Sequence, residues 1–343
     1  MQSVRLDDNR RLKLYQESTL PVQTGEVRLR INAVGICGSD LHRFRDVTFA
    51  GENNKGLVLG HEFSATILEI GKNVDDLQPG DRVAVEPGIH CGACEWCGKG
   101  QYNLCVNIKF CGVPPHDGAL RDELVWPAHL VYKLLPHMSH DDGVMLEPLA
   151  ICLHAIDLAH IKPGYTATVL GAGPIGLGTI HLLKQTSGCH TVIASEIIKE
   201  RLSMAERMGA DTLLDAKYTD VVAAVMDQTQ GRGVDVVFEA AGQPDTFEQA
   251  VEICAPGGRV LLIGIPEDNR IPFSAASARR KGLSLLLVRR SLLTVPRCMQ
   301  LMNSGLINVR PLVTHHFPLQ KAQQAFEWVD RYKDGVIKAV INP

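Results

Sequence analysis

The stretch best suited to chemistry is the glycine-rich segment Gly171-Ala-Gly-Pro-Ile-Gly176, near the middle of the chain. It has the pattern G-x-G-x-x-G, whose glycines permit a tight turn and a close approach of the backbone to a pyrophosphate. Glu196 stands twenty residues further on, where a carboxylate would accept hydrogen bonds from ribose hydroxyls. The motif therefore predicts a dinucleotide site, and its expected contacts are Gly171, Gly173, Pro174, Ile175, Gly176 and Glu196.

Four cysteines, Cys91, Cys94, Cys97 and Cys105, follow the spacing C-x2-C-x2-C-x7-C. Four thiolates so close in sequence can surround one Zn²⁺ tetrahedrally, and such a closed site leaves no position for a substrate. We therefore predict a structural zinc. Free thiols and an iron–sulfur cluster are the alternatives, and the long last interval argues against the cluster.

A second set of metal-binding side chains is dispersed along the chain: Cys37, His61, Glu62 and Glu147. A thiolate, an imidazole and one or two carboxylates would leave one position open, as a catalytic zinc requires. Taken singly, each has an ordinary explanation, since a lone cysteine is usually a core residue. Their spacing alone does not decide whether these four residues share one metal ion.

The elements around the glycine motif alternate between strand and helix. Apolar runs at 166–170 and 191–195 predict strands on either side of a helix at 177–184. The same alternation continues to residue 265 and predicts a doubly wound parallel sheet. Before it, alternating segments such as 26–34 and 63–70 predict an irregular β-barrel.

Composition bounds the class of protein. The chain has 343 residues, 45% hydrophobic and 21% charged, with a net charge of −3, which predicts two domains and offers no basic footprint for nucleic acid. Neither a signal peptide nor a membrane span is apparent, so we expect a cytoplasmic protein that does not bind membranes. Its ten cysteines should then be thiols or metal ligands rather than disulfides.

Several motifs together resemble the zinc-dependent medium-chain dehydrogenase/reductase family, most closely its sorbitol (polyol) dehydrogenase branch. They include Gly35-Ile-Cys-Gly-Ser-Asp-Leu-His42, Gly60-His-Glu-Phe63, Glu147-Pro-Leu149 and Asn308-Val-Arg-Pro-Leu-Val-Thr-His315. The resemblance implies an α/β protein with a GroES-like catalytic domain and zinc lobe at 1–149. A Rossmann NAD-binding domain would follow at 150–287, and 288–343 would return to the catalytic domain. It also implies a homotetramer or homodimer.

The resemblance implies a catalytic zinc in addition to the structural one. Cys37 and His61 would bind it directly, and Glu62 and Glu147 directly or through water. A glutamate at position 147 is similar to polyol and threonine dehydrogenases, because alcohol dehydrogenases proper have a cysteine there. Ser39 and His42 match the proton relay, although Ser39 could instead cap the following helix.

The coenzyme and substrate contacts follow from the same matches. Glu196 favours NAD over NADP, because a carboxylate repels a 2′-phosphate. Arg43 and Arg290 depart from the branch, which commonly has tyrosine and an aromatic residue there; they would either face solvent or bind substrate. The remaining matches are Arg201 beside the adenosine, Ile263, Gly264, Ile265, Val288 and Arg289 near the nicotinamide, and Phe110 and Arg289 near the substrate.

The expected activity is NAD-linked oxidation of a secondary alcohol in a sorbitol- or xylitol-like polyol to a ketose. A sugar acid, a phosphorylated polyol or an amino alcohol such as threonine is the alternative substrate. The alternative outside enzymes is an inactive nucleotide- and zinc-binding protein.

Overall fold

A computed structural model describes all residues 1–343, which form two compact units. Unit 1 consists of 1–147 together with 309–343, and unit 2 consists of 148–308. The expected return to the first domain at 288 is therefore displaced, because 288–308 stays with unit 2. Thr294 donates a hydrogen bond to the carbonyl of Ala150 at 2.9 Å, and Arg297 pairs with Asp157, so this segment is bonded to the helix that begins unit 2.

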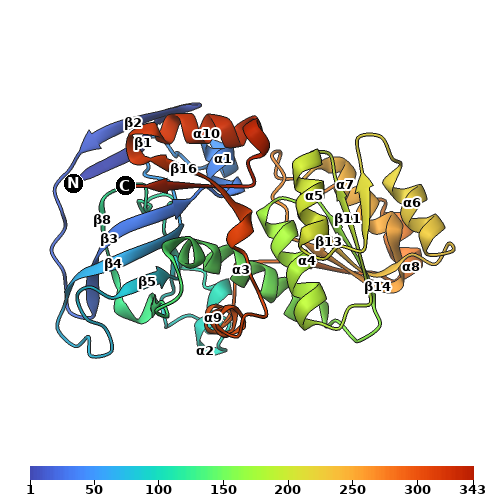
Figure 1. Cartoon of the computed structure of the whole chain (residues 1–343), viewed down its shortest axis with the longest axis horizontal. Helices are drawn as coiled ribbons and strands as arrows, with labels where there is room; N and C mark the ends of the chain where they lie inside the picture. Colours follow the sequence, from blue (N-terminus) through green and yellow to red (C-terminus); the bar gives the residue numbers. More distant parts are fainter. The chain divides into compact units, whose positions relative to one another are not determined.

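Unit 1 is built on a seven-stranded sheet whose strand order is β16-β17-β3-β4-β5-β9, with β8 also paired to β3. Strands β3, β4, β5, β8 and β16 of this sheet are labelled in Figure 1. The pairing of β17 with β3 joins the C-terminal strand to the first half of the chain, as the sequence predicts. The strands are β1 (Gln2–Asp8), β2 (Arg11–Gln16), β3 (Glu26–Gly35), β4 (Glu62–Ile70), β5 (Arg82–Val85), β6 (Gly88–Ile89), β7 (Lys109–Phe110), β8 (Glu123–Pro127), β9 (Val131–Lys133), β16 (Val313–Pro318) and β17 (Lys338–Asn342).

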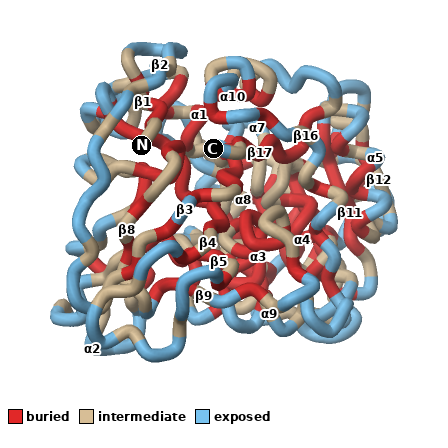
Figure 2. The backbone as a smooth tube through the Cα atoms, turned by 60° about the vertical axis from the view of Figure 1, so that its left-hand side comes forward, coloured by how far each residue is buried: buried red, intermediate tan, exposed pale blue.

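Apolar side chains on alternate positions of β3 form the centre of the unit 1 core. Val27, Leu29, Ile31 and Ala33 are buried, as expected for a strand with one face inward. The half of β4 that follows Glu62 is likewise buried (Figure 2). The helices of unit 1 are α1 (Gly38–Arg45), α2 (Glu95–Gly98) and α10 (Ala322–Asp330), with 3₁₀ turns at Phe49–Gly51, Tyr102–Leu104, Ala128–Leu130, Arg310–Leu312, Leu319–Lys321 and Lys333–Gly335.

Unit 2 contains a six-stranded parallel sheet of order β12-β11-β10-β13-β14-β15, which confirms the predicted doubly wound fold. The chain passes from β12 at one edge to β13 on the other side of β10. This reversal is the topological switch point, where such sheets bind dinucleotides at their carboxyl ends. The strands are β10 (Thr166–Leu170), β11 (Thr191–Glu196), β12 (Thr212–Asp215), β13 (Val234–Glu239), β14 (Cys254–Leu262) and β15 (Ser284–Leu287).

Helices cover the sheet of unit 2 and connect its strands. α3 (His140–Ala159) contains the boundary between the units and has Pro148 in its interior. The others are α4 (Pro174–Thr186), α5 (Lys199–Arg207), α6 (Val221–Gln228), α7 (Pro244–Ile253), α8 (Ala275–Lys281) and α9 (Val295–Asn303). No helix combines the length and apolar character needed to cross a bilayer.

Candidate catalytic and coenzyme sites

The four cysteines of the lobe come together as the spacing predicts. Their sulfur atoms all lie within 4.8 Å of one another, and the Cys94–Cys97 and Cys91–Cys105 pairs are each separated by 3.5 Å. Tetrahedral ligation at about 2.3 Å would place the sulfurs roughly 3.8 Å apart, so the set fits one Zn²⁺. Hydrogen bonds from the backbone N–H groups of Ala93 and Cys94 lower the pKa of Cys91 to about 6, which favours the thiolate that a metal needs.

The second donor set forms where β3 ends and β4 begins. Donor atoms of Cys37, His61 and Glu62 lie within 4.8 Å of one another. Cys37 is the N-cap of α1, and Glu62 is the first residue of β4 and pairs with Gly35 of β3. A Cβ on Gly35 would lie 2.4 Å from a Glu62 carboxylate oxygen, so only glycine fits beside this carboxylate. A thiolate, an imidazole and a carboxylate are a donor set that suits zinc.

Asp40 orients two of these ligands, a role that sequence reasoning missed although the residue stands inside the Gly35–His42 motif. Its fully buried carboxylate accepts hydrogen bonds from the N–H groups of Cys37, at 3.1 Å, and Gly60, at 3.2 Å. The same carboxylate lies 3.5 Å from Nδ1 of His61. Burial alone would lower the pKa of His61, but Asp40 and Cys37 raise it well above its usual value. Carboxylates in this position typically hold a metal-binding histidine in orientation.

Lys338 is the second residue that sequence reasoning missed. Its Nζ lies 2.5 Å from Oε2 of Glu62 and donates to the carbonyl of Ile36 at 3.0 Å, and both charged side chains are only 2% exposed. Burial would lower the pKa of Lys338, but Glu62 raises it, so the ammonium remains charged. A single lysine inside the apolar run 336–341 was the available signal, because a buried lysine needs a partner.

Glu147, on α3, stands outside the group of donor atoms within 4.8 Å. Desolvation by the surrounding protein raises the pKa of its carboxyl to about 7, with a further contribution from the charge of Glu62. Its service as a zinc ligand remains a prediction.

Ser39 and His42, the predicted relay residues, lie on α1 directly after Cys37. The N-cap of this helix is Cys37, so the alternative in which Ser39 caps the helix is wrong. The imidazole of His42 stacks on the ring of Phe49, with centroids 4.8 Å apart and planes inclined by 10°. The stacking fixes the orientation of the imidazole, while its relay role remains a prediction.

Of the predicted substrate residues in unit 1, Phe110 lies beside the metal ligands and Arg43 does not face solvent. The ring centroid of Phe110 is 5.4 Å from that of His61, as expected of an apolar wall. Arg43 is 7% exposed, and its guanidinium donates to Asn54 at 3.0 Å and to the carbonyl of Ser39 at 3.2 Å. The bond to Asn54 joins Arg43 to the segment 46–54. The alternative in which Arg43 faces solvent is therefore wrong, and its contact with substrate remains a prediction.

The glycine motif of unit 2 forms the turn between β10 and α4. Gly171 has φ +90°, and a Cβ on Gly176 would lie 1.9 Å from the carbonyl oxygen of Gly171. The carboxylate of Glu196 accepts a hydrogen bond from Ala172 N–H at 2.8 Å, and Arg201 Nη1 lies 3.8 Å from a Cβ built on Gly173. The carboxylate thus supports the turn itself, and its remaining lone pairs can still accept from a ribose.

The predicted nicotinamide contacts follow β14 and β15. Ile263, Gly264 and Ile265 come directly after β14, and Val288 donates a hydrogen bond to the carbonyl of Leu262 at 2.9 Å. Arg290, one residue past Arg289, has φ +54°, a left-handed conformation that is uncommon for residues other than glycine. All of these residues stand on the side of β10 opposite to Glu196.

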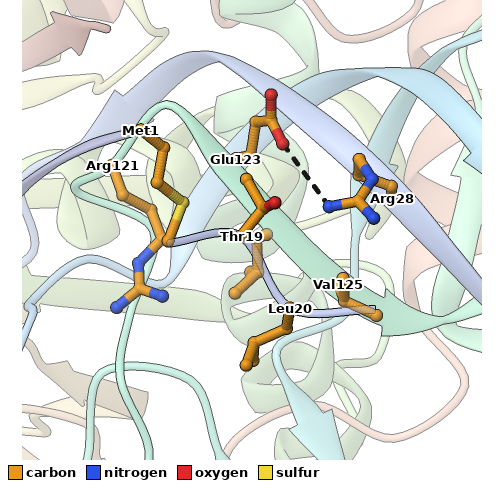
Figure 3. Close-up of a pocket in the computed structure, with 8 residues that line it drawn as sticks. Met1, Thr19, Leu20, Arg28, Arg121, Glu123 and Val125 are labelled. Carbon is orange, nitrogen blue, oxygen red and sulfur yellow. Dashed lines mark ion pairs between the residues drawn. The ribbon is translucent and has the colours of Figure 1, made fainter. Parts of the chain in front are cut away.

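Among the hollows of the molecule that contain none of the predicted site residues, two differ widely in volume. One, in unit 1, has a volume of about 10 Å³ and is lined by Met1, Leu20, Arg28 and Glu123, the last two paired at 3.6 Å (Figure 3). It has room for about one water molecule. The other, in unit 2, is a groove of about 600 Å³ at the end of α4 that lies away from the glycine motif.

Fold, zinc ligands and glycine motif together define a zinc-binding, dinucleotide-linked dehydrogenase, and comparison with known proteins agrees. Two family models match: an alcohol dehydrogenase GroES-like domain over residues 23–136 and a zinc-binding dehydrogenase domain over 174–304. Sorbitol dehydrogenase of Bacillus subtilis is 32% identical over 100% of this chain and 97% of its own length. L-idonate 5-dehydrogenase of Vitis vinifera is 37% identical over 92% of this chain and 88% of its own.

Solved structures show the same relationship and include bound coenzymes. Two of them have a TM-score of 0.91 and 29% identity, and cover 100% of this chain and 99% of their own. One is a zinc-binding dehydrogenase of Sinorhizobium meliloti bound to NADP, and the other is an alcohol dehydrogenase of Escherichia coli CFT073 complexed with NADH. The chain belongs to the zinc-dependent medium-chain dehydrogenase family, in its polyol dehydrogenase branch. It is an NAD-dependent zinc alcohol dehydrogenase.

Proposed function

We propose that this enzyme oxidises a secondary alcohol of a polyol to a ketone, so that the product is a ketose. The observation that carries the proposal is the group of Cys37, His61 and Glu62, held by Asp40 and Lys338 in unit 1, in a chain whose unit 2 carries the NAD motif. In the reaction the alcohol loses a hydride to NAD⁺ and a proton to the protein, and yields the ketone and NADH. The proposed location is the cytoplasm.

The chain's own residues would each have a defined task. When bound, zinc lowers the pKa of a substrate hydroxyl by Lewis-acid polarisation, and NAD⁺ accepts the hydride. Cys37 and His61 would hold the metal, and Asp40 would keep His61 oriented. Lys338 would balance the charge of Glu62, while Phe110 would exclude water beside His61.

Ser39 and His42 would remove the proton. Both stand within five residues of Cys37, and the stacking of His42 on Phe49 fixes one ring orientation. A histidine suits this task because its ordinary pKa lies near neutrality. The general-base contribution to catalysis is typically a factor of about 10²–10⁴.

The proposed substrate class is supported by the relatives of the chain and by the glutamate at position 147. The relative from Bacillus subtilis is a sorbitol dehydrogenase. The glutamate at position 147, where alcohol dehydrogenases proper have a cysteine, resembles polyol dehydrogenases. A second candidate is a sugar acid, because L-idonate 5-dehydrogenase is 37% identical and arginines occupy positions 289 and 290. A guanidinium can bind a carboxylate through two hydrogen bonds.

NADH absorbance with purified protein tests these assignments. We expect turnover with NAD⁺ on neutral polyols such as sorbitol and xylitol, and none with the Cys37→Ala variant. Preferred turnover of sugar acids, sugar phosphates or threonine would move the assignment to that class, and a salt-sensitive KM would support an anionic substrate. Turnover of simple primary alcohols with none on these classes would overturn the proposal, and no turnover of any alcohol would favour an inactive binding protein.

We also propose that the enzyme is a homo-oligomer, a tetramer or a dimer. β15 is the edge strand of the unit 2 sheet, and its Leu287 is 68% exposed. An exposed apolar edge strand is a template for pairing with a second chain. Sedimentation velocity at micromolar concentration tests this, and a single monomeric species would contradict it.

A further inference from the structure

Glu239, the last residue of β13, is a fully buried acidic residue in unit 2 with no assigned role in the metal chemistry or the coenzyme contacts. β13 adjoins β10 on the side opposite to β11 and its Glu196. Burying a carboxylate is unfavourable unless it is well hydrogen-bonded. The partners of Glu239 therefore indicate what it does.

One carboxylate oxygen of Glu239 organises the turn that follows β13. Oε1 accepts hydrogen bonds from the backbone N–H groups of Ala241, at 2.9 Å, and Gly242, at 2.7 Å. The hydroxyl of Thr246, in the first turn of α7, lies 2.7 Å from the same oxygen. These three donors fix the turn 240–242 relative to the start of α7.

The main chain of Glu239 fixes a second turn, the one that follows β14. Its carbonyl oxygen accepts hydrogen bonds from Ile263 N–H at 2.9 Å and Gly264 N–H at 3.0 Å. A Cβ on Gly264 would lie 2.3 Å from the nitrogen of Gly242 and 2.5 Å from Oε2 of Glu239. The two turns are thus in backbone contact, with Glu239 as their common partner.

The turn after β13 also touches the glycine motif. A Cβ on Gly171 would lie 2.9 Å from the nitrogen of Ala241, and Ala240 N–H donates to the carbonyl of Leu170 at 2.8 Å. Across the switch point of a doubly wound sheet, the dinucleotide extends from one half of the sheet to the other. Since Glu196 on β11 is the predicted partner of the adenosine ribose, the turns after β13 and β14 would border the nicotinamide half.

The second carboxylate oxygen of Glu239, Oε2, has different surroundings from Oε1. Oε2 is buried and has no hydrogen-bond partner, and it faces the backbone of Gly264. The hydrogen bonds from Ala241, Gly242 and Thr246 to Oε1 hold the carboxylate in its rotamer. A glutamine amide has the same shape and can keep its oxygen at the Oε1 position, whereas alanine removes the acceptor altogether.

We propose that Glu239 is a positioning residue for the nicotinamide half of the coenzyme. It acts by holding the turns 240–242 and 263–265 in the arrangement that receives the ring. The adenosine half, on the β11 side, does not depend on it. This inference depends on NAD binding and not on the identity of the alcohol.

Binding measurements test the inference without turnover. NADH affinity is measured by fluorescence, and AMP affinity by calorimetry, since AMP carries only the adenosine half. For Glu239→Ala we expect the Kd of NADH to rise at least tenfold while the Kd of AMP stays within twofold. For Glu239→Gln we expect the Kd of NADH to stay within threefold. Asp245→Asn is the control, because it removes an exposed carboxylate from the same helix start and should change neither value.

Thr246→Val supplies a second variant if Glu239→Ala does not fold, because it removes one donor to Oε1 and leaves the glutamate in place. We expect a several-fold rise in the Kd of NADH with AMP affinity unchanged. Equal loss of NADH and AMP affinity would show a general structural role and overturn the inference. Unchanged NADH affinity in Glu239→Ala would overturn it as well, as would a loss in Glu239→Gln equal to that in Glu239→Ala.

Discussion

Lys338 and Glu62 form a buried ion pair that joins the last strand of the chain to the first residue of β4, with Nζ 2.5 Å from Oε2. The pair places a positive charge beside Glu62, one of the three residues of the candidate metal site. The pair and the hydrogen bond from Lys338 to the carbonyl of Ile36 attach the C-terminal strand to the segment of unit 1 that carries Cys37, His61 and Glu62.

Replacing one partner of this ion pair should lower the free energy of unfolding more than replacing both partners. Lys338→Met leaves Glu62 buried and unpaired, and should lower the free energy of unfolding of the zinc-free protein by roughly 3–5 kcal/mol. Bound zinc should reduce this loss if Glu62 ligates the metal directly. Denaturant unfolding with and without zinc measures both, and Glu62→Gln combined with Lys338→Met should recover part of the loss. An unchanged stability in Lys338→Met would show that the pair is not important to the fold.

The two metal sites should respond differently to loss of a cysteine. The protein should contain about two zinc ions per chain, one for each set of donors. Cys37→Ala should abolish turnover and leave the thermal midpoint nearly unchanged, because the loop around it is held by Asp40. Cys94→Ser should lower the thermal midpoint and the zinc content, because it removes one of the four sulfurs that would hold the zinc of the lobe. Zinc content equal to wild type in Cys94→Ser would refute the structural site.

Preference for NAD over NADP should depend on Glu196. Its carboxylate accepts hydrogen bonds from Ala172, Ile197 and Ile198 at 2.8–3.1 Å, so it is fixed at the end of β11. A 2′-phosphate brought near it would be repelled. The kcat/KM with NAD should therefore exceed that with NADP. Glu196→Gln should reduce the ratio of the two values by about tenfold or more, the equivalent of roughly 1.4 kcal/mol. Equal efficiency of both coenzymes in the wild type would contradict this.

The sequence predicted the sheet of unit 2 well, because each of its strands is a short apolar run and each connection a helical one. It predicted the lobe because four cysteines lie within fifteen residues. Asp40 and Lys338 were missed, since their roles depend on contacts between segments far apart in the chain: Lys338 and Glu62 are separated by 276 residues. The burial of Arg43 could not be predicted from the sequence either, because it depends on how the segment 46–54 folds against α1 and places Asn54 beside the guanidinium.

Acid should weaken unit 1 through Asp117. Its carboxylate pairs with Arg5 and Arg121, at 2.8 Å each, and accepts from Val58 N–H at 3.0 Å. Burial alone would raise the pKa of Asp117, but these partners lower it below its usual value. A lowered pKa means that the stabilisation is fully present above the unfolded-state pKa of about 3.9, and is lost as the pH falls through the folded-state value.

Asp117→Asn measures that contribution. The difference in unfolding free energy between wild type and variant should be constant above about pH 5, on the order of 1–3 kcal/mol, and should shrink at lower pH. Comparing two proteins at each pH cancels the effect of acid on the zinc thiolates. A difference that grows as the pH falls would have the wrong sign for this pair.

The arginines at positions 43 and 290 should separate stability from substrate binding. Arg43 donates to Asn54 and to Ser39, and its guanidinium lies 5.9 Å from the ring centroid of Phe49, so Arg43→Ala should loosen the segment 46–54 and lower the thermal midpoint.

Arg290 should instead contact substrate hydroxyls, and Arg290→Ala should raise KM far more than it lowers kcat, because a contact made equally in the ground and transition states affects binding alone. Arg43→Lys and Arg290→Lys are matched controls that keep the charge and lose the planar guanidinium. Steady-state kinetics on the preferred substrate, with thermal unfolding of all four variants, provides the measurement. A fall in kcat with unchanged KM in Arg290→Ala would remove Arg290 from the substrate contacts, and a raised KM with unchanged stability in Arg43→Ala would place Arg43 among them.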